Sequence, residues 1–581
     1  MHHWSTRVRT LVITAKPRTP EPARTEGTTR PLPDFVFALA LWTVLATGWI
    51  ATKVFERVPH LEDEVALLFQ ARTYAAGHLL APAPALPAFF WIPFVVVHQG
   101  HWFGKYPPGY SLVLALGVLL HAPWLVNPLA AGLAVVLTAK LGQQLFDMTT
   151  GVLAAVLLAL SPFVLLQAGT FLMHVVCLDF VLLLLLAFEH FTRTGSPWSA
   201  AGAGVAFTGL WLSRPLTAVA VAVPCALWAL WLARRRTWRA GVLVMGLISV
   251  LALVLLLGYN ALTTGHPLVF GYQLWWPFDR IGFGPGIGVR GEHTLGQGWQ
   301  NTEENLHALA HWLFGWPGAL SVLPPLLGVA QAVVQFAAGR RDRACAWDVV
   351  LASLTVCLIV AYMAYWVSGQ MYGPRYYFES LGALALLSAR GLLWLNALGM
   401  HLLERIGWGR SSRAYAALGI LVLAGLISWN LLVFTPQQFR TYRNWYGVTS
   451  AGIQAVRAAG IHHAVVFVVA PKWTDYAPFF VENSPWLNGD VVYALDHGAA
   501  DAQLLAYYPD RAVYRWQSGQ LFLIRTADTP SPVPASRLMG QSAVPDRAAP
   551  SRESVAGWHA APAGGESPQQ TESHRPSGRT P

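Results

Sequence analysis

The sequence predicts an all-α polytopic membrane protein that ends in a small α/β domain. Of its 581 residues, 54% are hydrophobic and only 12% are charged. A soluble domain could not bury so much apolar surface in one core. After about residue 449, short β-rich runs such as "AVVFVV" and "DVVYAL" alternate with turns and helical stretches, which indicates a different, α/β kind of fold.

Eleven apolar stretches approach or reach the roughly 20 residues that a helix needs to cross a bilayer. They are 35–55, 126–145, 151–171, 175–192, 198–213, 215–233, 240–261, 317–337, 347–367, 376–398 and 414–434. A twelfth apolar stretch, 107–121, is shorter. We expect it to form a re-entrant or juxtamembrane helix in a long first external loop, where protein can cover its backbone.

Basic residues predict the orientation. They cluster in the N-terminal tail and after three of the stretches, in "ARRRTWR", "GRRDR" and "ERIGWGRSSR". The positive-inside rule puts all four clusters in the cytoplasm, and eleven spans satisfy this whereas twelve do not. The net charge of +10 thus reflects orientation, and no nucleic-acid partner is expected. The N-terminus is predicted to be cytoplasmic and the C-terminal domain extracytoplasmic.

The predicted domain organisation has four parts. Residues 1–33 form a disordered cytoplasmic tail, 34–435 a transmembrane domain, 436–528 the extracytoplasmic α/β domain, and 529–581 a disordered tail rich in Pro, Ser, Ala and Gly. The four cysteines have no paired spacing, which argues against a disulfide framework or a CxxC metal site.

Three successive acids, Glu62, Asp63 and Glu64, follow the first span on the predicted outer side. They begin an amphipathic stretch that we expect to lie along the membrane surface. One interpretation is that they only stabilise the positive end of the helix dipole. The other is that an Asp in a polar cavity acts as a general base for a hydroxyl group.

Three cations are predicted to face the same side. Arg214 and Arg375 each lie at the junction of two spans, and Lys105 lies in "GKYPPGY" before the short helix. Charges at such depth are costly and are usually paired or functional, although contact with lipid headgroups is the simpler alternative. Three cations that converge near the acidic run suggest a phosphate site, because Arg binds phosphate bidentately and Lys binds it as a point charge.

A third group consists of Glu304, His307 and His311, which share one helical face in "NTEENLHALAHW". Two His four residues apart can hold a metal, but an interfacial helix with a polar face gives the same pattern. The Gly-rich segment "DRIGFGPGIGVRGEH" has no preceding strand, so it does not predict a nucleotide site.

Over about residues 35–435, the motifs "LEDE" (61–64), "GKYPPGY" (104–110) and "YGPRYY" (372–377) resemble the GT-C superfamily of integral-membrane glycosyltransferases. The similar branch contains protein O-mannosyltransferases and aminoarabinose transferases, which depend on polyprenyl-phosphate sugars. The resemblance implies that Asp63 is the catalytic base, with Glu64 beside it. The donor phosphate would be bound by basic and tyrosine side chains, namely Lys105, Tyr106, Arg214, Arg375 and Tyr376. Some members hold a divalent metal, for which Glu64 with His307 or His311 would be the counterpart.

The resemblance therefore implies transfer of a sugar, with inversion, from a polyprenyl-phosphate carrier to an extracytoplasmic glycan, lipid or protein acceptor. Membrane lipids are the other expected partners. Two alternatives stay open at this point. A transporter or flippase of an anionic lipid-linked sugar would use the same cations without a base, and a non-catalytic scaffold would depend on the C-terminal domain instead.

Overall fold

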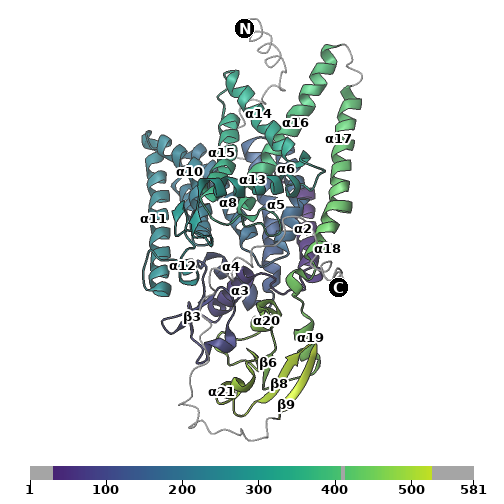
Figure 1. Ribbon diagram of the computed structural model, residues 1–581. Coiled ribbons are helices and arrows are strands. Elements are labelled where there is room, and N and C mark those ends of the chain that lie inside the picture. The colour runs from purple at the N-terminus through teal and green to yellow at the C-terminus, as the bar shows by residue number, and fades with distance from the viewer. Residues whose placement is uncertain (1–30, 407–411, 527–581) are drawn as a thin grey trace, which may run out of the picture.

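The computed structural model describes residues 31–406 and 412–526 (Figure 1). Within them the chain is mostly helical, with a small mixed sheet near the C-terminal end. Residues 1–30 and 527–581 are not described. The predicted tail 529–581 therefore lies outside the described residues, and so does the predicted tail 1–33 except for residues 31–33.

Nine helices in the described ranges are long and apolar enough to cross a membrane. The chain is therefore an integral membrane protein. These helices are α2 (Asp34–Lys53), α5 (Val126–Leu145), α8 (His174–Thr194), α10 (Pro215–Leu232), α11 (Arg236–Thr264), α14 (Leu323–Ala337), α15 (Arg343–Met363), α16 (Leu381–Arg405) and α17 (Ser412–Trp429). Helix α14 reaches the length of a span, 18 residues, together with the 3-10 turn of residues 320–322 before it. The last span continues through a π-helical turn, η6 (Asn430–Phe434), into α18 (Thr435–Tyr442).

The two other expected spans are helical but differ from a full crossing. Stretch 151–171 is the pair α6 (Met148–Ala159) and α7 (Pro162–Ala168), bent by 58°. Pro162 starts α7, and a proline cannot continue the hydrogen-bond ladder of the preceding helix. Stretch 198–213 is α9 (Pro197–Trp211), which has only 15 residues. The expected eleven spans thus become nine, or ten if the bent pair is one span, in the part of the chain that the structure describes.

The connection between α2 and α5 carries most of the site. It contains α3 (Glu62–Ala75), a three-stranded antiparallel sheet and the short apolar helix α4 (Gly109–Leu119). The strands are β1 (Ala81–Pro82), β2 (Val95–His98) and β3 (His101–Gly104), with the 3-10 turn η1 (Pro87–Phe90) before β2. The short helix expected within 107–121 is present as α4.

Helix α3 is not amphipathic, so the expectation of an amphipathic helix was wrong. Residues 64–71 are all buried, because α4, strand β3 and the C-terminal domain cover different sides of the helix. The apolar residues of α3 are consequently distributed around its whole circumference rather than along one stripe.

The connection between α11 and α14 contains α12 (Gly271–Trp275), a two-stranded ribbon of β4 (Gly284–Pro285) and β5 (Glu292–His293), and α13 (Leu295–Trp312). A 3-10 turn, η3 (Leu320–Val322), precedes α14, and another, η4 (Arg375–Ser380), precedes α16.

The small C-terminal domain is α/β, as predicted. Its helices are α19 (Ala451–Ala458), α20 (Trp473–Phe480) and α21 (Asp501–Leu505). Its strands are β6 (Ala464–Val468), β7 (Val491–Leu495), β8 (Ala512–Gln517) and β9 (Gln520–Arg525), in the order β7-β6-β8-β9. The pairings β7-β6 and β6-β8 are parallel, and β9 is antiparallel to β8. The sheet lies beside α3 and β3 at one end of the helical bundle (Figure 1).

The opposite end of the bundle holds the connection of α14 to α15 and the adjoining ends of α16 and α17 (Figure 1). The basic residues Arg340, Arg341, Arg343 and Arg405 belong to these segments. The separation of these basic residues from the C-terminal sheet is what the predicted orientation requires.

Candidate functional site

Asp63 is the centre of a group of charged and aromatic side chains at the start of α3. Its Oδ1 accepts a hydrogen bond from the Tyr106 hydroxyl, and its Oδ2 accepts one from Nη1 of Arg375 at 3.2 Å. The side chains of Asp63 and Arg375 are 16% and 13% exposed, so the ion pair is largely but not fully enclosed. The structure thus brings together three residues that lie far apart in the sequence.

The three successive acids have different environments. Glu64 is 1% exposed, and its Oε2 accepts from the backbone N–H of His60. Burial raises the pKa of Glu64 to about 8, and burial followed by the charge of Asp63 raises the pKa of Glu62 to about 7. Burial would also raise the pKa of Asp63, but the charges of Arg375 and Lys105 and the hydrogen bonds to its oxygens keep it below its ordinary value. Asp63 is therefore the most readily ionised of the three carboxyl groups.

Close backbone packing fixes the segment that carries Lys105 and Tyr106. A Cβ on Gly104 would lie 2.7 Å from the backbone oxygen of Ala66, so only glycine lets this segment approach α3 so closely. The amide of Gln70 donates to the Tyr106 carbonyl at 2.8 Å. Helix α3 and the Lys105–Tyr106 segment are thereby held as one unit.

Lys105 is enclosed beside this unit. Its nearest carboxylate is Asp279, with 3.9 Å between Nζ and Oδ2, and the two side chains are 4% and 3% exposed. Asp279 comes from the connection between α11 and α14, and the sequence analysis did not select it. It could have been found from "WWPFDR", where an acid follows a run of aromatic residues.

Arg214 lies in a second buried group, contributed by α8, α10, α15 and η4. Its Nε lies 3.0 Å from Thr217 Oγ1 and 3.4 Å from Glu379 Oε1, its Nη1 lies 2.6 Å from His174 Nδ1, and its Nη2 donates to the Tyr362 hydroxyl at 2.5 Å. Glu379 was also missed by the sequence analysis. All three guanidinium nitrogens of Arg214 thus already have partners within the protein.

Tyr376 joins the two groups. Its ring stacks on Tyr362 with 4.5 Å between centroids and 12° between planes. The guanidinium carbons of Arg214 and Arg375 each lie 5.6 Å from the Tyr376 ring centroid. The expected donor-phosphate residues therefore surround one region next to Asp63. Of Arg214 and Arg375, it is Arg375 whose buried Nε has no hydrogen-bond partner in the described residues.

The expected metal ligands do not come together. His307 and His311 are neighbours on α13, with 4.9 Å between ring centroids. However, no group of three His, Cys, Asp or Glu side chains able to hold a metal occurs in residues 31–406 and 412–526, so Glu64 does not complete a site with them. These residues do not fit a metal centre in this structure.

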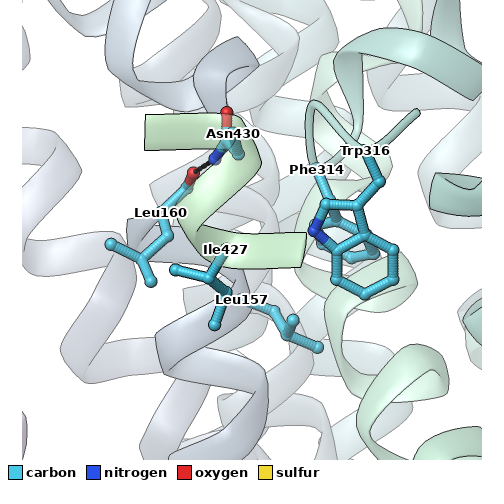
Figure 2. A pocket seen from close by; sticks show the side chains of 6 residues that line it. All are labelled: Leu157, Leu160, Phe314, Trp316, Ile427 and Asn430. Atoms are coloured by element: carbon cyan, nitrogen blue, oxygen red, sulfur yellow. Dashed lines mark hydrogen bonds between the residues drawn. The ribbon is translucent and has the colours of Figure 1, made fainter. Parts of the chain in front are cut away.

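A separate small pocket lies between α6, η6 and the segment before α14 (Figure 2). It is lined by Leu157, Leu160, Phe314, Trp316, Ile427 and Asn430. The Asn430 amide donates to the Leu160 carbonyl at 2.7 Å, which satisfies a backbone group left open at the bend between α6 and α7. The pocket contains no charged residue, so it is not part of the charged site.

The similarity of this chain to known proteins is weak. Residues 464–533 match a family described as a domain of unknown function (DUF7846). No curated protein matches the sequence. Among solved structures, ArnT from Cupriavidus metallidurans bound to undecaprenyl phosphate is 14% identical with a TM-score of 0.49, over 83% of this chain and 91% of that chain.

The Archaeoglobus fulgidus oligosaccharyltransferase tethered with an acceptor peptide is 13% identical with a TM-score of 0.44, over 78% of this chain. This chain covers 63% of that one. The same oligosaccharyltransferase in complex with Zn and sulfate is 14% identical with a TM-score of 0.46, over 77% of this chain and 61% of that one. Likenesses of this size do not assign an activity.

Proposed function

We propose that this protein is a GT-C-type membrane glycosyltransferase that moves a sugar from a polyprenyl-phosphate carrier to an extracytoplasmic acceptor, with inversion. One observation carries the proposal: the ionised carboxylate of Asp63 is hydrogen-bonded to Tyr106 and Arg375 in a largely enclosed site, with Lys105 close enough to influence its charge. A base next to two cations is what displacement of a phosphate by a hydroxyl group requires.

In the proposed reaction, Asp63 accepts the proton of an acceptor hydroxyl or amine while that atom forms a bond to the anomeric carbon. The bond between this carbon and the phosphate oxygen breaks, and its electron pair leaves with the phosphate. One displacement from the opposite face inverts the configuration. Lys105 and Arg375 neutralise the charge that grows on the phosphate. A lipid phosphate is already a good leaving group, so a weak, always ionised base is sufficient.

The other predicted residues have supporting roles in this proposal. The Tyr106 hydroxyl orients the Asp63 carboxylate. The guanidinium nitrogens of Arg214 already have partners within the protein, so Arg214 positions the Tyr376 ring beside the phosphate and does not bind the phosphate directly. Glu64 is buried against His60 and supports the start of α3. No step is assigned to His307 or His311.

The domain boundaries and the orientation belong to the same proposal. Residues 34–435 form the catalytic membrane domain, and the α/β domain of residues 436–528 lies on the extracytoplasmic side with the site. The N-terminus is then cytoplasmic. The carrier reaches the site laterally from the membrane, and the acceptor arrives from the same side as the α/β domain.

The test is transfer of a radiolabelled sugar from a panel of polyprenyl-phosphate donors by the purified full-length protein. Asp63→Asn should lower kcat by about 10²- to 10⁴-fold, as expected for loss of a general base. It should not weaken donor binding, because removal of a negative charge leaves the two cations in place. Glu303→Gln, an exposed acid on α13, is the matched control and should behave as wild type.

Transfer that is unchanged by Asp63→Asn would remove Asp63 as the base. If no donor gives turnover but labelled lipid crosses a vesicle membrane, the flippase alternative would replace the transferase.

A further inference from the structure

The ammonium group of Lys105 lies in a cage of aromatic rings. Its Nζ is 3.3 Å from the ring centroid of Phe94, 4.8 Å from that of Trp276, and 5.5 Å from those of Tyr106 and Tyr272. Ring faces attract a cation, and the attraction is stronger where water is excluded. The cage therefore holds the ammonium group without using its N–H donors.

The backbone around the cage is unusual. Phe94 has a φ of +67°, a conformation that bulky side chains rarely adopt. Its carbonyl accepts the backbone N–H of Lys105 at 3.0 Å, which secures the two residues to each other. On the other side, a Cβ on Gly271 would lie 2.9 Å from the Cα of Lys105, so glycine permits this approach of α12. Such strain is typical of functional sites.

Asp279 is the counter-ion at the wall of the cage, and it is fixed in place. Its Oδ1 accepts hydrogen bonds from the Tyr365 hydroxyl at 2.8 Å and from the Trp366 indole N–H at 3.0 Å. Its Oδ2 is 3.9 Å from Lys105 Nζ, which is too long for a direct hydrogen bond. Among the described residues, Nζ makes no hydrogen bond although its side chain is 4% exposed. A buried ammonium has three donors, and leaving them unused is costly unless a ligand supplies acceptors.

We propose that Asp279 is a positioning residue of the donor site, a fixed counter-ion that holds the Lys105 ammonium in its aromatic cage and leaves its N–H donors for the donor phosphate. This rests on the proposed function, because it takes the ligand of Lys105 to be a polyprenyl phosphate. A direct Asp279–Lys105 hydrogen bond would compete with the phosphate, whereas a carboxylate held at 3.9 Å compensates the charge without taking the donors.

The charges that face Lys105 determine how the loss of Asp279 would change the protonation of the Lys105 amine. Burial lowers the pKa of Lys105, while the negative charges of Asp279, then Asp63 and Glu62, raise it, and Arg375 lowers it. The neighbouring phenols, on Tyr106, Tyr272 and Tyr365, have pKa values raised well above the ordinary one by burial, so they stay neutral. Removal of Asp279 therefore lowers the pKa of Lys105 further, and more of the amine becomes neutral as the pH rises.

The experiment measures binding of a sugar-free polyprenyl monophosphate to the full-length protein in lipid nanodiscs, from about pH 6 to about pH 9, which spans the range below the ordinary Lys pKa. Because the phosphate itself titrates near the lower limit, each variant is compared with wild type at the same pH. For Asp279→Asn, we expect the ratio of variant Kd to wild-type Kd to grow by roughly tenfold or more as the pH rises, as the ammonium is lost.

Three further comparisons make this test specific. Asp279→Glu keeps the charge, so its ratio should not change with pH. The arginine of Lys105→Arg is protonated at every pH tested. The Kd of the double variant Lys105→Arg/Asp279→Asn, divided by the Kd of Lys105→Arg alone, should therefore not change with pH. Glu292→Gln, an exposed acid of the same connection, should match wild type.

A ratio for Asp279→Asn that is constant over the pH range would overturn the proposal, because a merely structural role gives a loss that does not depend on pH. Absence of polyprenyl-phosphate binding by the wild-type protein would overturn it as well. If the wild type binds the lipid and shows the expected pH behaviour but transfers no sugar, the proposed transferase function fails while the role of Asp279 stands.

Discussion

Tyr106→Phe removes a single hydroxyl from the centre of the site and leaves the ring that borders Lys105. Tyr106 is 4% exposed, and its hydroxyl donates to one oxygen of Asp63 while Arg375 donates to the other. A hydrogen bond to a charged group is worth about 1.5–3 kcal/mol. Since about 1.4 kcal/mol is a tenfold change in rate, we expect kcat to fall by roughly 10- to 100-fold.

The effect should depend on the carboxylate. In an Asp63→Ala background the hydroxyl has no acceptor there, so Tyr106→Phe should cost less than about threefold, and the two changes should be strongly non-additive. All four proteins are assayed by single-turnover transfer of labelled sugar, with thermal unfolding measured in parallel to show that each is folded. Equal losses in both backgrounds would refute the view that Tyr106 acts by orienting Asp63.

Two other predictions test the phosphate contact and the domain packing. Arg375→Lys keeps the charge but loses the planar fork and the buried Nε–H, so the donor KM should rise by about tenfold or more, and an unchanged KM would argue against phosphate binding there. Phe480→Ala removes a side chain that is 1% exposed and should lower the free energy of unfolding of the α/β domain by about 3–5 kcal/mol, measured by denaturant titration with domain-specific proteolysis. Phe522→Ala, 46% exposed on β9, is its control, and equal losses would contradict the packing argument.

Sequence reasoning predicted much of the fold because hydropathy and β patterning are local signals. All eleven expected stretches are helical, and the change to an α/β fold after about residue 449 is confirmed. It overestimated the number of full spans because the bend before α7 and the short length of α9 depend on how neighbouring helices pack.

The juxtaposition of Asp63, Lys105, Tyr106 and Arg375 followed from three short motifs, whereas the roles within the acidic run did not. Successive helical residues point about 100° apart, so three adjacent acids cannot face one site. Sequence alone does not show which of them is turned inward, and the structure places Glu64 against the backbone of His60.

The counter-ions were missed for a different reason. Asp279 and Glu379 reach Lys105 and Arg214 only after distant connections fold over the bundle. A general argument could have found them: a buried cation needs an anion, and both acids stand in aromatic-rich segments, "WWPFDR" and "YYFES".

The packing of the last domain on the first loop has a consequence for biosynthesis. Phe480 lies 5.7 Å from Phe69 and 5.6 Å from Trp102, measured between ring centroids, and the Ser450 backbone N–H donates to Glu56 at 2.8 Å. During translation, the side chains of α3 and its hairpin that Phe480 contacts therefore stay exposed until about 380 further residues have been made. The first external loop is thus covered only late in biosynthesis, and a chain that ended at residue 447 would have the nine described spans but would lack the domain that packs on α3.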